Sequence, residues 1–404
     1  MSILFGHPTG NPNSHNAAVA YLDAGVLECF CVSWMPSEKT IGILKSCRPL
    51  RQSAQRLERR RFPALSHVPK VQGRVSEIRR LLMRTLASNG WQSDEANRWL
   101  MRTMARECRR ATVSALHAYE DCSLWPFIEA KRLGKACIYD MPICYYPARE
   151  KTHAELSRKY PDWIPSNWSP ITHDRLLDQK RQEMTLSDLT LVPSGYAEGT
   201  IREFYPHKDI VRAPYGVEAE FWTPGPISKP AGPLRFIYAG QVSLRKGIPL
   251  LIEAWSKADL RDAELALVGF WFLAEGKRRS LPPGIKWFPP CSSQALRDRY
   301  RESDVFVFPS FAEGFGLVLL EAMACGLPAI ASEATIGPEI ITPACGFISP
   351  TGDLDRLVEL LRWFNRHRDQ LPIMGQKARA QAARCTWSNY RSLVVAAVSQ
   401  AGLI

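Results

Sequence analysis

In the C-terminal half of the chain, short apolar runs alternate with longer stretches whose apolar residues recur at helical spacing. Such short runs predict buried strands, and the stretches between them predict the helices that cover a sheet. The expected strands are Leu234–Ala239, Glu264–Val268, Ile285–Phe288, Val305–Phe308 and Pro328–Ala331. The expected helices are Ile248–Lys257, Ser292–Glu302, Gly316–Cys325 and Asp353–Phe364. This order predicts a doubly wound α/β sheet.

The N-terminal half has a weaker pattern of the same kind. Strands are expected at Val113–Tyr119, Ala136–Asp140 and Leu189–Pro193, with a helix at Leu124–Leu133. Between the halves, Glu218–Pro233 lacks periodicity and is rich in proline and glycine, which predicts a linker. A chain of 404 residues is also too long for one ordinary core, so we expect two α/β domains.

The formal net charge is +12, and most of the excess lies between Lys45 and Arg110. A basic surface of this kind favours an anionic partner such as nucleic acid, an anionic membrane or a phosphorylated ligand. The run Arg56, Arg59, Arg60 and Arg61, followed by the apolar and basic stretch Ile78–Leu86, suggests either a solvated helix face or docking to an anionic membrane. A nucleic-acid-binding protein is the less favoured alternative, because no recognition motif or set of interleaved aromatic platforms accompanies the charge.

Several classes are disfavoured by what the sequence lacks. Its 11 cysteines include no CxxC pair, and neither a Gly-x-Gly-x-x-Gly loop nor a Walker lysine loop occurs. The N-terminus does not have the pattern of a signal peptide, and no apolar run approaches the roughly 18–20 residues that span a bilayer. We therefore expect a cytoplasmic protein whose membrane contact, if any, is peripheral.

The most informative segment runs from Val305 to Pro328. An apolar strand is followed by a loop with Glu313, Gly314 and Gly316, and then by a helix that carries Glu321. Glycines let the backbone approach a ligand closely, and the free N–H groups of a helix N-terminus bind anions. Carboxylates beside such a site can each accept hydrogen bonds from two vicinal hydroxyls of a sugar or ribose.

This segment resembles the glutamate–seven-residue–glutamate motif of retaining GT-B glycosyltransferases of family four (glycosyl transferases group 1), and the resemblance is firm over about residues 185–390. It implies two Rossmann-like domains facing a cleft, at residues 1–216 and 217–387, with a helix at about 388–404 crossing back to the first. It also implies that Glu313 and the backbone of Gly314, Phe315, Gly316 and Leu317 hold the donor sugar, and that Glu321 holds the ribose.

A second segment, Arg235–Gly247, resembles the family's diphosphate-binding loop. It implies donor contacts at Gly240, Gln241 and Lys246. The family's first arginine is Gln241 here, so Arg245 is expected to supply the second cation. Lys246, Arg245 and Glu313 are thus the expected catalytic residues, since cations can stabilise charge on the leaving phosphate.

Other parts of the chain resemble the family less specifically. Phe288, in the stretch Trp287–Pro290, is expected to border the nucleotide base. Gly10 and Asn11, in a loop after a short first strand, are expected to face the donor phosphates and the acceptor. No histidine stands where the family often has one near the reacting carbon, and Asp140, Glu120 and His173 remain open as substitutes.

The sequence spells one metal-binding pattern of other glycosyltransferases, Asp353-Leu354-Asp355, but acidic residues also suit the first turn of the expected helix. We therefore expect no metal and no cofactor besides a nucleotide-sugar donor. The resemblance implies metal-independent, retaining transfer of a sugar to a glycan or lipid-linked acceptor, in cell-surface polysaccharide or glycolipid synthesis. A non-catalytic glycosyltransferase-like binding protein is the alternative.

Overall fold

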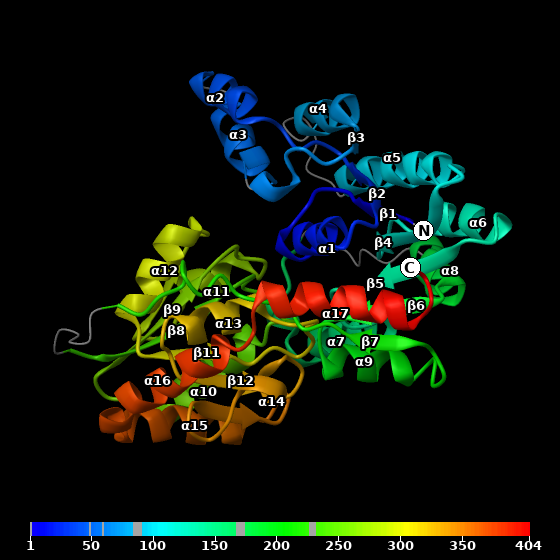
Figure 1. The fold of residues 1–404 in the computed structure, drawn as a ribbon. Helices are drawn as coiled ribbons and strands as arrows, with labels where there is room; N and C mark the ends of the chain where they lie inside the picture. Colours follow the sequence, from blue (N-terminus) through cyan, green and yellow to red (C-terminus); the bar gives the residue numbers. More distant parts are fainter. Residues whose placement is uncertain (1, 48–49, 59, 84–90, 167–173, 226–231) are drawn as a thin grey trace.

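Two parallel β-sheets, one from each half of the chain, form the framework of the computed structural model (Figure 1). The structure describes residues 2–47, 50–58, 60–83, 91–166, 174–225 and 232–404. The expected stretch at 78–86 lies partly outside these residues, as do His173 and the side chains of Arg56 and Arg59. No helix in the described ranges combines the length and the apolar character that crossing a membrane would require.

The first sheet has the strand order β3-β2-β1-β4-β5-β6-β7. Its strands are β1 (Ser2–His7), β2 (Leu27–Val32), β3 (Lys70–Gln72), β4 (Val113–Tyr119), β5 (Ala136–Asp140), β6 (Leu189–Val192) and β7 (Ile210–Arg212). Its helices are α1 (Pro12–Asp23), α2 (Glu38–Ser46), α3 (Arg51–Glu58), α4 (Arg74–Met83), α5 (Trp91–Glu107), α6 (Leu124–Arg132), α7 (Tyr146–Lys159), α8 (Asp174–Leu186) and α9 (Gly195–Arg202). Strands β1, β4, β5 and β6 are almost wholly buried, as expected for a parallel sheet covered on both faces.

The second sheet has the order β10-β9-β8-β11-β12-β13. Its strands are β8 (Leu234–Ala239), β9 (Ala263–Val268), β10 (Ile285–Phe288), β11 (Val305–Phe308), β12 (Ala329–Ser332) and β13 (Gly346–Ser349). The helices around it are α10 (Ile248–Ala258), α11 (Glu275–Arg279), α12 (Ser293–Glu302), α13 (Leu317–Ala324), α14 (Gly337–Ile340), α15 (Leu354–Arg366) and α16 (Leu371–Ala382). The strand order reverses between β8 and β11, and ligands bind beyond the carboxyl ends of strands at such a switch point.

The elements expected in this half are present, with small shifts at their ends. Helix α13 begins at Leu317 rather than Gly316, because Gly316 has φ +95° and stands outside the helix as its N-cap. Helix α15 begins at Leu354, because the Asp353 side chain accepts a hydrogen bond from the N–H of Arg356 and caps it. Of the described residues, no group of three or more histidine, cysteine or carboxylate side chains could hold a metal ion.

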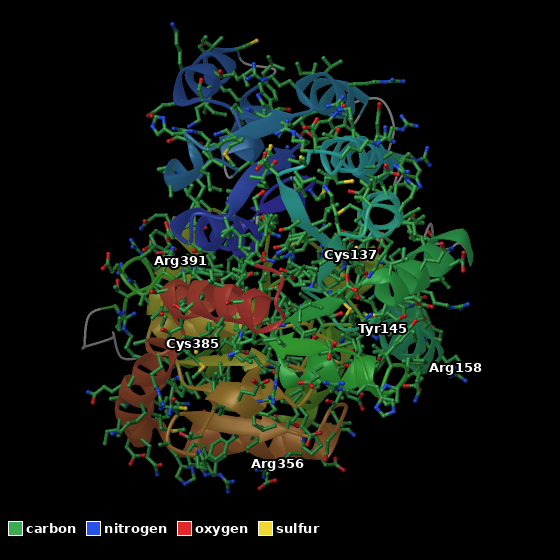
Figure 2. All side chains as sticks on the ribbon, turned by 45° about the vertical axis from the view of Figure 1, so that its right-hand side comes forward. Cys137, Tyr145, Arg158, Arg356, Cys385 and Arg391 are labelled. Carbon is green, nitrogen blue, oxygen red and sulfur yellow. The ribbon has the colours of Figure 1, made fainter. Side chains whose placement is uncertain are left out.

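The last helix, α17 (Trp387–Gln400), returns from the second sheet and packs against α1 of the first (Figure 1). Arg391, labelled in Figure 2, donates a hydrogen bond from Nη1 to Oδ1 of Asn16 at 3.1 Å. The carboxyl edges of the two sheets also meet directly, since Ser194 after β6 donates its hydroxyl proton to the carbonyl oxygen of Gly314 after β11. The loops at these two edges therefore lie on either side of one interface.

Candidate active site

A cavity of about 200 Å³ lies at the switch point of the second sheet. Three segments that follow strands supply its walls, together with the sides of α12 and α13. Its lining residues are Ala239, Gly240, Val268, Gly269, Phe270, Pro290, Cys291, Leu296 and Val318. Gly240 was predicted from the sequence, and Pro290 ends the stretch Trp287–Pro290 that was expected to border the base, whereas Gly269, Phe270 and Cys291 were not predicted. Gly269 directly follows the apolar run of β9, and a glycine at the end of a buried strand could have indicated that this loop lines a ligand site.

The loop after β8 and the loop after β11 are joined by a cluster of charges. Lys246 is 9% exposed, and its ammonium group forms an ion pair with the Glu313 carboxylate. Arg245 Nη1 lies 3.8 Å from Glu313 Oε2 and donates to the carbonyl oxygen of Ala312 at 2.5 Å. The structure therefore brings together the three residues predicted to be catalytic.

Opposing influences act on the charge of Lys246. Burial and the neighbouring Arg245 guanidinium lower the pKa of Lys246 well below its ordinary value. The Glu313 carboxylate opposes this effect, because an opposite charge at contact distance favours the ionised form. Two cations held beside one carboxylate leave an excess of positive charge at this point, which suits an anionic ligand.

The N-terminus of α13 lies in the same loop. Gly316 is held at φ +95°, and a Cβ atom there would lie 2.7 Å from the Phe308 ring, so both the backbone and the space favour glycine. No side chain caps this end of α13. Its first N–H groups therefore remain available to an anion, as expected from the sequence.

Glu321 lies one turn beyond Val318 on α13, so both face the same side of the helix. Burial raises the pKa of Glu321 to about 7. In the described part of the chain, no ion pair or side-chain hydrogen bond reaches its carboxylate. The residue is half-buried, so its carboxylate is partly removed from water and is suited to accept hydrogen bonds from ligand hydroxyls.

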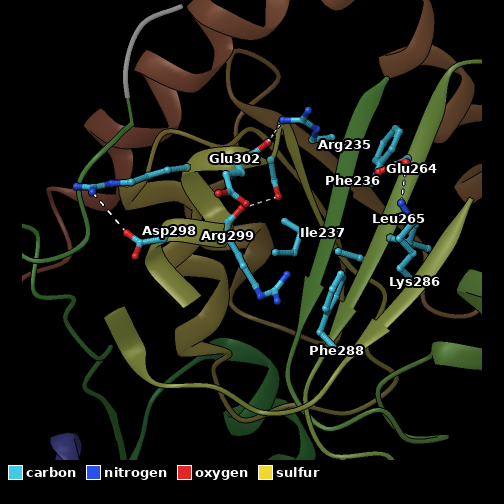
Figure 3. Close-up of a pocket in the computed structure, with 13 residues that line it drawn as sticks. Arg235, Phe236, Ile237, Glu264, Leu265, Lys286, Phe288, Asp298, Arg299 and Glu302 are labelled. Atoms are coloured by element: carbon cyan, nitrogen blue, oxygen red, sulfur yellow. Dashed lines mark hydrogen bonds and ion pairs between the residues drawn. The ribbon is translucent and has the colours of Figure 1, made fainter. Parts of the chain in front are cut away.

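Gln241 and Phe288 do not line the cavity at the switch point. The Gln241 side chain is exposed, and its carbonyl oxygen accepts a hydrogen bond from the Tyr238 hydroxyl at 2.7 Å. The Phe288 ring lies under the Arg299 guanidinium, 3.8 Å from its carbon to the ring centroid (Figure 3). It lines a separate groove of about 670 Å³ between β8–β10 and α12. Successive side chains of a strand point to opposite faces of the sheet. The sequence did not reveal to which face of the sheet the Phe288 ring would point.

The N-terminal loop faces the second domain through the first turn of α1. Asn11 is the N-cap of α1, and Gly10 before it has φ +73°. Asn13 Nδ2 donates to the Tyr215 hydroxyl at 3.2 Å, and the Tyr215 ring lies 5.0 Å from that of Phe315. This chain of contacts leads from the loop of Gly10 and Asn11 to the segment Gly314–Gly316.

The structure separates the candidates for the histidine role. The Asp140 carboxylate is buried and lies 3.3 Å from Nε2 of His117, which is also buried. The Glu120 carboxylate pairs with the buried Lys180 ammonium at 2.8 Å. His173 lies outside the described residues. Asp140 and Glu120 thus both hold buried partners in their own domain, and the histidine role stays open.

The basic run of the first half is not a uniform surface. Arg60 is 8% exposed and pairs with the buried carboxylate of Glu77 at 2.9 Å. Arg61 pairs with Glu38 at 3.2 Å. The prediction that Arg60 belongs to an exposed membrane-docking face is therefore wrong, because this cation neutralises a buried acid.

Sequence comparison places the second half of the chain among known transferases. The family model described as Glycosyl transferases group 1 matches residues 224–381. Sulfoquinovosyl transferase SQD2 of Arabidopsis thaliana is 30% identical over 228 residues, which are 50% of this chain and 42% of that protein. O-antigen chain mannosyltransferase B of Escherichia coli is 29% identical over 164 residues, which are 38% of this chain and 42% of that protein. The matches thus span less than half the length of these curated relatives.

Solved structures resemble the chain over its whole length. Sucrose-phosphate synthase from Thermosynechococcus elongatus has a TM-score of 0.65 at 16% identity, with 99% of this chain and 98% of that chain covered. HepE from Anabaena, solved in complex with UDP-glucose, has a TM-score of 0.62 at 15% identity, with 99% and 100% covered. At this identity the likeness concerns the fold alone. The chain has the two-domain GT-B fold, and its residues 224–381 match the model of the glycosyl transferases group 1 family.

Proposed function

We propose that this chain is a glycosyltransferase that moves a sugar from a nucleotide-diphosphate sugar to a glycan or lipid-linked acceptor with retention of configuration. The observation that carries the proposal is the grouping of Lys246, Arg245 and Glu313 beside the uncapped N-terminus of α13, with Glu321 one turn further along. Cations and helix N–H groups suit a diphosphate, and the carboxylates suit sugar and ribose hydroxyls.

The donor occupies the cavity at the switch point in this proposal. Its base lies against Pro290 and Cys291, its ribose binds the Glu321 carboxylate, and its diphosphate lies between Lys246 and the start of α13. UDP-sugars are the donors we consider first, since HepE was solved with UDP and with UDP-glucose. GDP-mannose is the donor we consider second, since a relative of Corynebacterium glutamicum is named as a GDP-mannose-dependent mannosyltransferase.

In the reaction, the bond between the anomeric carbon and a diphosphate oxygen breaks, and a bond to the acceptor hydroxyl oxygen forms. Negative charge then develops on the leaving diphosphate, where Lys246, Arg245 and the α13 N-terminus stabilise it without a metal. The acceptor proton passes to a leaving phosphate oxygen. This route needs no separate base, which agrees with the buried pairing of Asp140 and Glu120.

The acceptor binds the first domain in this proposal, and helices α2 and α3 guide the chain to an anionic membrane. Ile43 on α2 and Leu50 just before α3 are 63% and 37% exposed. The same helices carry the exposed cations Lys39, Lys45 and Arg51, of which Lys45 pairs with Glu58. Such a combination suits peripheral contact with anionic lipid, where each cation contributes about 1 kcal/mol.

A thermal-shift panel of UDP-, GDP- and ADP-sugars tests the donor class. A ligand that binds only the folded chain raises its apparent stability by mass action. We expect one base to raise the Tm clearly, and the Glu321→Ala variant to lose most of that increase. Failure of every nucleotide sugar to raise the Tm would contradict the proposed function.

A further inference from the structure

Two exposed aromatic rings lie beside the cavity at the switch point, on the segment that follows β9. Among the described aromatic side chains, only Phe204, Phe270 and Phe272 are exposed, and the last two are neighbours in space. Their rings are 59% and 52% exposed, with centroids 6.2 Å apart and planes inclined by 55°. Apolar rings gathered on a surface favour contact with a ligand or partner, because covering them removes apolar area from water.

Hydrogen bonds fix the backbone that carries these two rings. The N–H of Val242, in the loop after β8, donates to the Phe270 carbonyl oxygen at 2.8 Å, and the Val242 carbonyl oxygen accepts from the N–H of Phe272 at 2.9 Å. This parallel bridge continues β9 beyond its end, so successive side chains alternate in direction. Trp271 packs against Trp287, with ring centroids 6.4 Å apart, and Phe270 and Phe272 share the opposite face. A ligand that stacks on the two phenylalanines therefore finds them already in place.

The same segment connects the cavity with the first domain. At one end, Gly269 and Phe270 line the cavity at the switch point. At the other end, the N–H of Ala274 donates to the carbonyl oxygen of Trp163, in the first domain, at 2.9 Å. The proposed function places the nucleotide sugar in this cavity and the acceptor on the first domain. The exposed rings therefore lie along the route between the two substrates.

An open aromatic surface of this kind suits a sugar ring. A pyranose carries hydroxyl groups around its edge and C–H groups on its faces, so one face can cover an aromatic ring while the hydroxyls stay in water. A wholly apolar ligand would be better served by an enclosed pocket. An anionic membrane calls for cations that are free to meet it. Two of the three cations of α11, Lys277 and Arg278, instead lie over the Trp163 and Trp287 rings, at 5.2 and 4.5 Å from the ring centroids.

We propose that Phe270 and Phe272 form a sugar platform, on which one face of a pyranose ring of the acceptor stacks. The proposal rests on the function proposed above and narrows its acceptor to a glycan, free or lipid-linked, of two or more sugars. In the strand order β9-β8-β11, the loop after β9 lies two strand spacings, about 10 Å, from the loop that carries Glu313. This distance exceeds the width of one sugar ring. The sugar on the platform is therefore a neighbour of the sugar whose hydroxyl group reacts.

Saturation-transfer NMR on the full chain tests the platform directly. The chain is deuterated except at its phenylalanines and saturated with UDP, or with the diphosphate whose base the thermal-shift panel selects. Disaccharides of glucose, galactose and mannose are then added. Irradiation of the phenylalanine ring protons should transfer saturation to the C–H groups on one face of one sugar of a bound disaccharide.

Matched variants separate stacking from general effects on the fold. Both rings are exposed, so the double variant with Phe270→Ala and Phe272→Ala should keep the wild-type Tm. We expect it to bind the disaccharide about tenfold more weakly, because two stacked rings are lost, and to keep the wild-type affinity for the nucleotide sugar. Phe272→Tyr retains a ring and should bind the disaccharide like the wild type. Phe204→Ala removes the third exposed ring and is the control that should change neither affinity.

Four results would overturn the sugar platform. They are a panel in which no disaccharide receives saturation from phenylalanine, a double variant with wild-type disaccharide affinity, a double variant that loses nucleotide-sugar affinity, and a double variant that loses sedimentation with anionic vesicles. The third would place the rings against the nucleotide base, and the fourth against lipid. Each leaves the proposed function intact if a nucleotide sugar still raises the Tm of the wild type. If no nucleotide sugar does so, the proposed function fails, and the platform fails with it.

Discussion

Gly314 of the glutamate loop lies against Pro142 of the first domain so closely that there is no room for a Cβ atom between them. The Pro142 carbonyl oxygen and the Ile143 Cα occupy the space that such an atom would need. The hydroxyl of Ser194, also in the first domain, donates a hydrogen bond to the Gly314 carbonyl oxygen. Closure of the two domains therefore depends on the absence of a side chain at Gly314.

Replacing Gly314 with alanine should hold the domains apart, because the added methyl group meets backbone atoms that have little freedom to move. We expect turnover to fall at least tenfold, since a misplaced site loses much of the advantage of orientation. Small-angle scattering with saturating donor should give a larger radius of gyration than for the wild type. Gly199→Ala is the matched control, because nothing lies within 4 Å of its Cβ position. An unchanged radius and turnover in Gly314→Ala would show that the contact does not govern closure.

Replacing Lys246 with methionine should reduce turnover by roughly a hundredfold, the scale expected when one charge-stabilising group is lost. Methionine keeps much of the apolar stem and loses the ammonium group, whose nitrogen lies 5.1 Å from the centroid of the Phe308 ring, so the fold should survive. Arg245→Met provides the comparison, since Arg245 lies 3.8 Å from the same Glu313 oxygen. Nearly normal turnover in Lys246→Met, together with an inactive Arg245→Met, would show that Arg245 and not Lys246 is the main cation that stabilises the leaving diphosphate.

Donor affinity should depend on pH through Glu321. Burial raises the pKa of Glu321 from 4.5 to about 7, so the carboxylate is protonated below that pH and loses accepting capacity. Binding of a nucleotide sugar, whose diphosphate does not titrate near neutrality, should weaken as pH falls from 8 to 6. Calorimetric titration checks this, with Glu321→Gln as the variant that should bind more weakly at pH 8 and show no such slope. An identical slope in the variant would place the titrating group elsewhere.

The same raised pKa has an opposite effect on the chain without donor. The folded state binds the Glu321 proton more tightly than the unfolded state, so this group lowers the stability of the fold as pH rises from about 4.5 to 7. Glu321→Gln should therefore raise the Tm of the free protein at pH 8 and leave it nearly unchanged at pH 4.

Changing Lys39, Lys45 and Arg51 on α2 and α3 to serine should abolish sedimentation with anionic vesicles at low salt. Three cations at about 1 kcal/mol each correspond to roughly a hundredfold in partitioning, and salt should weaken the binding of the wild type. Exchange of the exposed Lys257, Lys286 and Lys377 in the second domain is the control and should have little effect. A wild-type chain that ignores anionic vesicles at low salt would rule out the docking surface.

The sequence predicted the second sheet well because its strands are short, uniformly buried runs between helices of clear periodicity. Glycines and charges at strand ends indicated a ligand site that includes Lys246 and Glu313, and the structure brings these two residues together. Their roles, like that of Glu321, stay predictions. The sequence missed the burial of Arg60, because the partner Glu77 lies on α4, 17 residues further along the chain, and a run of arginines is typical of an exposed surface.

Release of nucleoside diphosphate from the donor, followed by proton NMR of the anomeric position of the sugar product, tests the central claim most directly. The wild-type chain with the donor selected by the thermal-shift panel should release the diphosphate and give a product with the donor's anomeric configuration. Lys246→Met should release it roughly a hundredfold more slowly. A chain that binds the donor but releases no diphosphate, with or without acceptor, would contradict the account and identify a non-catalytic binding protein.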